Sequence, residues 1–235
     1  MKMIRKLPPV LPTKKIIISF LCLFIAGNLI IAPFVACSNP SSNELLDWEI
    51  RKIEKELDQN PGDLEKRVNL ALLYHDAGFN KKAVSELQTV LKAEEAYSNA
   101  LIALGYVYIG MESYEKALEP YAKLVELNKD NPMRYISRQL EAVYYYMGVA
   151  YYNLSRYQDA INSLGEALII DKTDADAWYL LGNVYYDSGD FPNAIESFKQ
   201  TLRFVPDFKE TYQSLYNCYE KNRARGTCLI CQCYG

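Results

Sequence analysis

Cysteine is the residue type in this chain with the most evident chemistry, and most of it is crowded at one end. Cys228, Cys231 and Cys233 form a C-x2-C-x-C cluster within the last ten residues. Such a cluster can hold a soft metal ion such as copper(I) or zinc, because thiolates favour those ions. Cys218 is the one other candidate ligand nearby, and an oxidising compartment would favour disulfides instead. We therefore assign no metal site and expect a disordered tail with one or two disulfide bonds.

Catalytic motifs are missing from the sequence. His75 is the single histidine, and no motif pairs it with a serine or cysteine nucleophile. Neither a glycine-rich phosphate loop nor an H-E-x-x-H helix occurs. We expect a protein that is not an enzyme, with no catalytic residues and no cofactor. His75 is expected to be a partly exposed or hydrogen-bonded structural residue.

The N-terminal segment is typical of export. Five basic residues precede an uncharged run over 16–36, and the first acidic residue is Glu44. This pattern predicts a signal peptide over 1–36, and the run of about 20 residues could also span a bilayer as an anchor. The sequence Phe34-Val35-Ala36-Cys37 resembles the lipobox of bacterial lipoproteins, which implies lipidation of Cys37. A polar tether over 37–43 follows, while an uncleaved anchor and ordinary secretion remain alternatives.

Charge limits the partners of the exported chain. The whole sequence has 26 basic and 29 acidic residues, and five of the basic ones precede Cys37. The chain from Cys37 onward has 21 basic and 29 acidic residues, which gives a net charge of −8. Nucleic-acid binding needs a basic face, and so does electrostatic attachment to anionic lipid. We exclude nucleic acid and expect the membrane link to be a lipid anchor or a signal anchor, in the cell membrane or outer membrane.

A spaced set of residues recurs along the rest of the chain. In 175–208 it consists of Trp178, Leu181, Gly182, Tyr185, Ala194, Phe198 and Pro206. Related sets occupy 64–97, 98–131 and 141–174, with Arg67 at the first aromatic position. The pattern W-x2-L-G-x2-Y, A-x3-F and P resembles the tetratricopeptide repeat (TPR), a 34-residue helix–turn–helix unit. The resemblance implies an all-α, right-handed superhelical solenoid of four stacked units, because one unit cannot bury its own apolar face.

Incomplete units flank the four repeats. We predict an N-terminal capping helix over 44–63, a half repeat that begins at a capping box formed by Ser41 and Glu44. A C-terminal capping helix over 209–225 and the cysteine-rich tail over 226–235 close the chain.

One insertion, over 132–140, interrupts the register before the third repeat. With Asn131 as N-cap and Pro132 at the first helical position, it is expected to extend the next helix by about two turns. It is either a tolerated extension or an extra contact surface.

The resemblance also implies a concave face lined by positions 5, 9 and 12 of each repeat. These positions hold Val68, Leu72, His75, Ile102, Tyr106, Ile109, Tyr145, Val149, Tyr152, Tyr179, Asn183 and Tyr186. The absence of lysine and arginine from this set argues against a clamp for a C-terminal carboxylate. Tyrosine offers rigid apolar area with a polar tip, which suits a peptide segment. The predicted peptide-binding groove comprises Tyr106, Tyr145, Tyr152, Tyr179, Asn183 and Tyr186, and the alternative is that these rings mostly serve packing.

These inferences predict a membrane-anchored TPR scaffold of the bacterial cell envelope that binds protein partners through its groove. Two alternatives remain: a structural repeat protein that associates with itself, and an accessory subunit that recruits an envelope enzyme.

Overall fold

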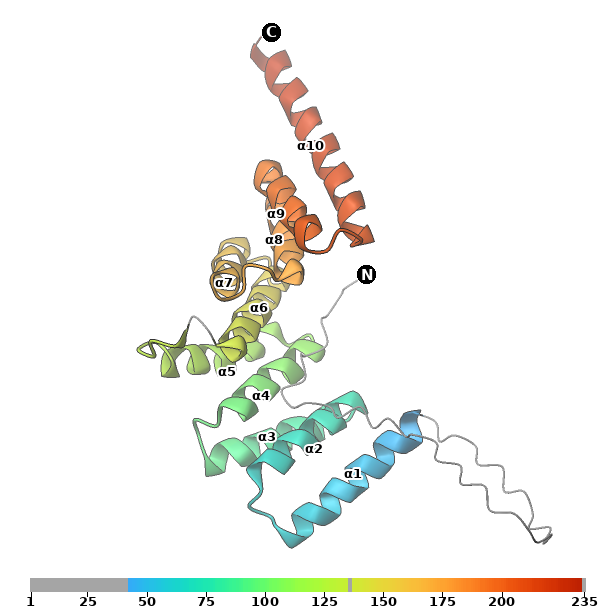
Figure 1. Cartoon of the computed structure of the whole chain (residues 1–235), viewed down its shortest axis with the longest axis vertical. Helices are drawn as coiled ribbons and strands as arrows, with labels where there is room; N and C mark the ends of the chain where they lie inside the picture. The colour runs from blue at the N-terminus through green and yellow to red at the C-terminus, as the bar shows by residue number, and fades with distance from the viewer. Residues whose placement is uncertain (1–41, 135–136, 234–235) are drawn as a thin grey trace, which may run out of the picture.

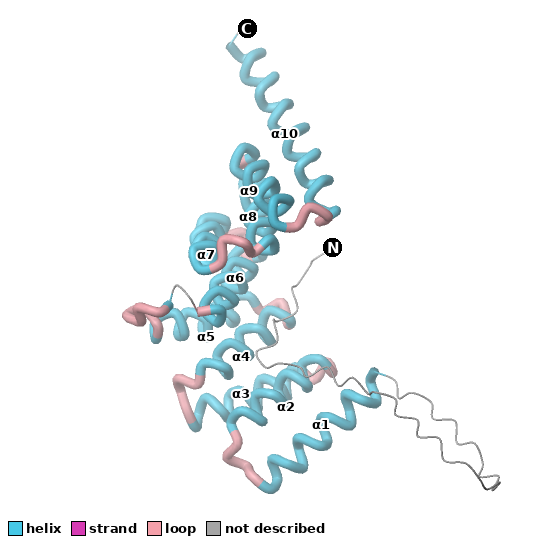
Figure 2. Tube along the Cα trace, in the orientation of Figure 1, coloured by secondary structure: helices cyan, strands magenta, loops and turns pink. Residues whose placement is uncertain are grey.

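The computed structural model describes residues 42–134 and 137–233, which form helices joined by turns and contain no strand (Figure 2). Residues 1–41, with the predicted signal, Ser41 and Cys37, lie outside the described part. The helices are α1 Ser42–Gln59, α2 Leu64–Asp76, α3 Asn80–Ala93, α4 Ser98–Gly110, α5 Tyr114–Leu127, α6 Arg138–Asn153, α7 Tyr157–Ile170, α8 Ala175–Ser188, α9 Phe191–Phe204 and α10 Lys209–Cys233.

The helices stack in chain order into an elongated array, with α1 at one end and α10 at the other (Figure 1). Each of the pairs α2–α3, α4–α5, α6–α7 and α8–α9 packs tightly within itself. The first helices also touch one another, α2 with α4, α4 with α6 and α6 with α8. The predicted all-α solenoid of helix–turn–helix repeats is therefore confirmed.

The turn inside each repeat is built at one equivalent position, the fifteenth. The backbone there is left-handed, with φ of 82° at Gly78, 55° at Glu112, 57° at Ser155 and 85° at Gly189. In each case the next N–H bonds to a carbonyl five residues back, as in Asp190 N to Tyr185 O at 2.8 Å. This closes the first helix in the manner of a Schellman turn and reverses the chain.

The two helices of a repeat meet at a small residue in position 8 and a large one in position 24. A Cβ atom built on Gly182 would lie 2.6 Å from the Phe198 ring, and one on Gly148 would lie 2.7 Å from Leu164. Phe198 and Leu164 are fully buried. The absence of a side chain at position 8 therefore sets how closely the helices approach.

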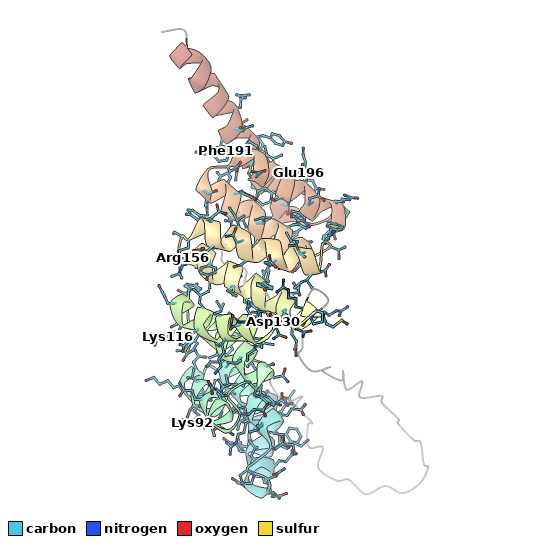
Figure 3. All side chains as sticks on the ribbon, turned by 90° about the vertical axis from the view of Figure 1, so that its left-hand side faces the viewer. Lys92, Lys116, Asp130, Arg156, Phe191 and Glu196 are labelled. Atoms are coloured by element: carbon cyan, nitrogen blue, oxygen red, sulfur yellow. The ribbon has the colours of Figure 1, made fainter. Side chains whose placement is uncertain are left out.

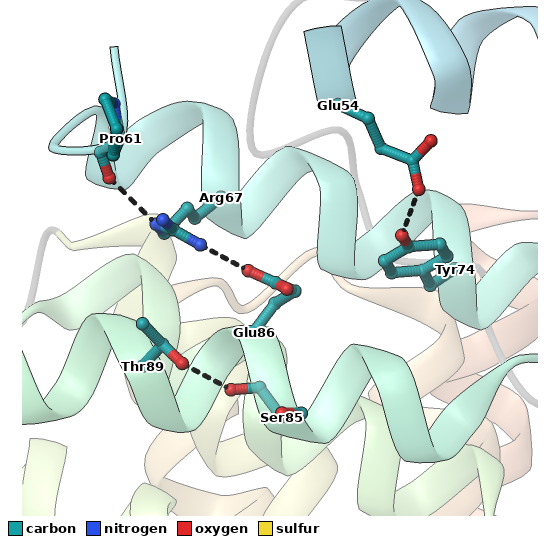
Figure 4. Close-up of polar contacts among 7 residues, drawn as sticks. All are labelled: Glu54, Pro61, Arg67, Tyr74, Ser85, Glu86 and Thr89. Atoms are coloured by element: carbon teal, nitrogen blue, oxygen red, sulfur yellow. Dashed lines mark hydrogen bonds and ion pairs between the residues drawn. The ribbon is translucent and has the colours of Figure 1, made fainter. Parts of the chain in front are cut away.

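The first repeat replaces the aromatic residue at position 4 with Arg67. Its guanidinium donates to the Pro61 carbonyl at 3.1 Å and pairs with Glu86 of α3 at 2.7 Å (Figure 4). Close by, the Tyr74 hydroxyl donates to Glu54 of α1 at 2.5 Å. Polar contacts thus supplement the apolar packing that joins α1, α2 and α3.

The insertion at 132–140 does not form the predicted two-turn extension. Asn131 accepts from the Met133 N–H at 2.9 Å and closes a turn, and Ser137 caps α6 by accepting from the Leu140 N–H at 3.4 Å. Of the described residues of the insertion, only 138–140 belong to an α-helix, which is less than one turn. The prediction was wrong because two good N-cap residues competed, and the later one begins the helix.

The last helix is longer than predicted. It continues beyond residue 225 through most of the cysteine-rich tail to Cys233, which corrects the expected disordered tail. The side chains of Cys228, Cys231 and Cys233 lie outside the described ones. Cys218, in contrast, is fully buried among Ala194, Ile195 and Phe198 of α9.

Burial raises the pKa of the Cys218 thiol to about 11. Since the thiolate is the nucleophile, Cys218 should resist iodoacetamide at pH 8 in the folded protein and react after denaturation in urea. Peptide mass mapping would measure this, and rapid native labelling would contradict the docking of α10.

The raised pKa of Cys218 also makes the stability of the fold depend on pH. The protonated thiol stabilises the folded state fully at pH values below its ordinary pKa of about 9. The contribution of Cys218 to stability should therefore be lost as the pH rises from about 9 to about 11.

Candidate peptide-binding face

The first helices α2, α4, α6 and α8 form one side of the array, and the second helices form the other. Lys92, Lys116 and Glu196 belong to the second helices α3, α5 and α9 and stand on the outer side viewed in Figure 3. The predicted groove residues all belong to α4, α6 and α8. The order of packing along the array therefore places them on one continuous face.

Position 5 of the repeat is mostly buried, which corrects part of the predicted groove. Tyr145 is 5 % exposed and packs on Tyr146 with 5.4 Å between ring centroids. Ile102 at the same position in the second repeat is 2 % exposed. Because adjacent first helices touch, this position falls between them. Tyr145 therefore contributes to the core rather than to an accessible surface.

Tyr106 lies at the centre of an aromatic chain that crosses three repeats. Its ring meets His75 edge-on at 5.3 Å and Tyr146 edge-on at 5.7 Å. The His75 Nδ1 atom is 2.7 Å from the Asn80 Oδ1 atom, so the imidazole is held by a hydrogen bond. His75 is thus the hydrogen-bonded structural residue that was expected. Tyr106 remains half-buried, so part of its surface is accessible.

Tyr152 joins the third repeat to the fourth. Its hydroxyl donates to the Asp187 carboxylate at 2.5 Å, a bond from α6 to α8. Burial, and then this bond, hold the pKa of Tyr152 well above its usual range, so the phenol remains a donor. Asp187 was not among the predicted residues, although it directly follows position 12 of its repeat.

The fourth repeat contributes the remaining predicted residues. Tyr179 packs against Phe198 and Phe208, with ring centroids 5.6 and 4.9 Å away, and Tyr186 packs against Phe191 at 5.5 Å. All of these tyrosines keep part of their surface exposed. The half-buried Asn183 side chain makes no hydrogen bond within the described part of the chain, so its amide can serve a ligand.

The accessible part of the predicted groove therefore consists of Tyr106, Tyr152, Tyr179, Asn183 and Tyr186. Fixed aromatic rings supply apolar contact area at little entropic cost, while phenols and one amide supply hydrogen bonds. The described residues contain no group of histidine, cysteine or acidic side chains placed to hold a metal ion. Nor is any described helix long and apolar enough to cross a bilayer. The arrangement can bind a polypeptide segment.

These features define a helical-repeat protein of the kind that binds other proteins. Family models described as TPR repeat or tetratricopeptide repeat match residues 47–102, 98–131, 148–189 and 175–208. The chain belongs to the tetratricopeptide repeat family, and its repeats serve as a scaffold for protein–protein interaction.

Curated relatives are distant and much longer. The chain is 22 % identical over 213 residues to "Tetratricopeptide repeat protein 8" of Caenorhabditis elegans, a match that covers 90 % of this chain and 38 % of that protein. It is 26 % identical over 160 residues to "BBSome complex member BBS4" of Bos taurus, a match that covers 68 % of this chain and 29 % of that protein. "Lipopolysaccharide assembly protein B" of Escherichia coli K12 is 22 % identical over 151 residues, covering 63 % and 37 %. The chain therefore spans less than two fifths of each.

Solved structures share the architecture more fully. A crystal structure of MamA aligns with a TM-score of 0.62 at 28 % identity, covering 71 % of this chain and 86 % of that one. YrrB, described as a TPR protein with an unusual peptide-binding site, aligns with a TM-score of 0.60 at 18 % identity, covering 75 % and 86 %. The second likeness concerns the fold alone.

Proposed function

We propose that this chain is a membrane-anchored adaptor of the bacterial cell envelope, which holds a segment of a partner protein on the face of its third and fourth repeats. The observation that carries the proposal is the group formed by Tyr152, Tyr179, Asn183 and Tyr186. Three half-buried rings, each fixed by an aromatic or hydrogen-bonding neighbour, share this face with an amide that makes no hydrogen bond within the described part of the chain. Surfaces rich in rigid tyrosine are frequent sites of protein recognition.

The chemistry of the face selects the kind of segment. None of the twelve positions that were predicted to line it is lysine or arginine, and Asp187 lies beside Tyr152. A segment with apolar side chains and neutral or basic charge fits, whereas a terminal carboxylate would find no cation. Asn183 can bond to the backbone of an extended segment with one donor and one acceptor. YrrB, which shares the fold, is described as having a peptide-binding site, which supports a peptide as the ligand.

The envelope location rests on the N-terminal sequence. A basic segment, an uncharged run and a lipobox-like Ala36-Cys37 pair form an export signal with a lipidation site. The name of the Escherichia coli relative, which refers to lipopolysaccharide assembly, is in keeping with an envelope role. The repeat architecture supports function by binding, without catalysis.

Photo-crosslinking in membranes tests the binding proposal. A photoreactive amino acid at Asn183 should capture a discrete partner, while the same group at Glu196, exposed on the outer helix α9, should not. Mass spectrometry of the adduct then identifies the partner. Equal capture at the two positions would contradict a binding site on the face of the first helices.

The anchor gives a separate prediction. Cys37→Ser should block lipidation and leave a larger, unprocessed precursor, because the thiol carries the lipid. Fatty-acid labelling and gel mobility would measure both effects. With seven residues from 37 to 43, the tether reaches at most about 24 Å, so the repeats would stay close to the bilayer. A variant that is processed like the wild type, together with no label on the wild type, would rule out lipidation.

A further inference from the structure

The two terminal helices of the array carry apolar side chains in clusters on their exposed sides. Leu45 and Trp48 of α1 are 53 % and 62 % exposed. Tyr212, Tyr216 and Tyr219 of α10 are 55 %, 61 % and 49 % exposed, and we call these three the tyrosine stripe. On the described helices between the two ends, large exposed hydrophobic side chains occur singly. The terminal helices therefore have contact surface that the chain itself does not cover.

The repeat register explains the tyrosine stripe. Tyr212, Tyr216 and Tyr219 stand at positions 4, 8 and 11 of an unfinished fifth unit. In the fourth unit, Gly182 at position 8 lies against Phe198 of the second helix, and Tyr185 at position 11 packs on the buried cluster to which Phe198 belongs. Helix α10 continues past position 15, where the repeats turn, to Cys233, so no described second helix packs on it. The tyrosine stripe lies on the side that a second helix would cover.

The net charges of α1 and α10 identify α1 as a helix that fits on the tyrosine stripe of α10. Helix α1 contains six acidic and three basic residues, a net charge of −3. Helix α10 contains four basic and two acidic residues, a net charge of +2. Within one molecule the two helices lie at opposite ends of the array and do not touch (Figure 1). They can meet only between copies.

We propose that the tyrosine stripe of one copy docks the exposed side of α1 from a second copy, so that molecules associate head to tail. Trp48 and Leu45 would pack on the rings, and the opposite net charges would favour this pairing over α10 with α10. The contact joins α10 of one copy to α1 of the other. In a pair, the α1 surface of the first copy and the α10 surface of the second therefore stay unoccupied. Association of this kind grows into chains unless it closes into a ring.

Two variants of the full chain, purified in mild detergent, test the proposal through light scattering coupled to size exclusion. Wild type should grow in mass with concentration. Trp48→Glu and Tyr216→Glu should each remain monomeric, because each removes one side of the contact. An equimolar mixture of the two should form a dimer, since each variant retains the surface that the other lacks. Circular dichroism should be unchanged, as both side chains are more than 60 % exposed.

The control is Ile169→Glu, which replaces a residue on α7 that is 53 % exposed and should assemble like the wild type. Association should also weaken as salt shortens the screening length from about 10 Å at 0.1 M to about 3 Å at 1 M. A wild type that stays monomeric overturns the proposal, as does a mixture that stays monomeric. Loss of assembly in Tyr216→Glu with none in Trp48→Glu would indicate a symmetric α10 contact instead. A Tyr152→Ala and Tyr186→Ala variant should assemble normally, which separates this contact from the peptide-binding face.

Discussion

Gly182→Leu should lower the thermal unfolding midpoint more than any other single change considered for the four repeats. Even a Cβ atom at this position would lie 2.6 Å from the Phe198 ring, and Phe198 is fully buried with no room to retreat. Forcing a side chain into such a contact costs roughly 1–3 kcal/mol, and sometimes more. Thermal unfolding followed by circular dichroism would measure the shift. The midpoint serves as a comparison, because unfolding of a repeat array need not be two-state.

Gly165 provides the matched control. It lies on α7, and a Cβ atom there would have no neighbour within 4 Å. Gly165→Ala should raise the midpoint slightly, since alanine is favoured over glycine in helices by up to about 1 kcal/mol. Gly182→Ala should lower it despite the same gain in propensity. The first repeat shows that alanine is accommodated at position 8 when position 24 is leucine, because it pairs Ala71 with Leu87. Phe198→Leu should therefore partly rescue Gly182→Ala, and an unchanged midpoint in Gly182→Leu would mean the register is wrong.

Tyr152→Ala combined with Tyr186→Ala should abolish capture of the partner. Central aromatic anchors dominate interface energies, with roughly 2 kcal/mol or more lost per ring, so two rings correspond to about a thousandfold in affinity. Helical circular dichroism and membrane fractionation should stay as in the wild type, because both rings are only half-buried. Capture by the Asn183 crosslinker, or co-purification from membranes, would measure the loss.

Single changes separate the contributions within this pair. Tyr152→Phe keeps the ring but loses the hydrogen bond to Asp187, so it should retain most of the capture. Glu196→Lys on the outer helix α9 should have little effect. Normal capture by the double variant, together with loss of capture when 134–139 is deleted, would move the site from the first helices to the insertion.

The fold could be predicted because the same few positions carry the same kind of residue four times. Position 8 is glycine or alanine, position 24 is large, and one deviation such as Arg67 does not disguise the pattern. The insertion could not be predicted in this way, because it occurs once. Asn131 and Ser137 are both good N-cap residues, so the sequence alone does not say which one begins the helix. In the structure Asn131 closes a turn through the Met133 N–H, and Ser137 caps α6 through the Leu140 N–H.

The candidate site could be predicted only in part. Tyrosine fits both a core and a surface, so residue type alone could not distinguish buried Tyr145 from half-buried Tyr152. The distinction depends on how closely neighbouring first helices approach, which is a property of the stacked array. Asp187 was missed for a related reason, because its partner Tyr152 lies 35 residues away in another repeat.

The pattern of helix contacts has a consequence for how the chain is made. Each helix packs mainly on the next one or the next but one, as α2 does on α3 and α4. No described repeat depends on contacts with a distant part of the sequence, so folding can follow synthesis from the N-terminal end, one unit at a time. A unit added or lost in the course of evolution would likewise disturb only its immediate neighbours, and would change the length of the molecule without redesigning its core.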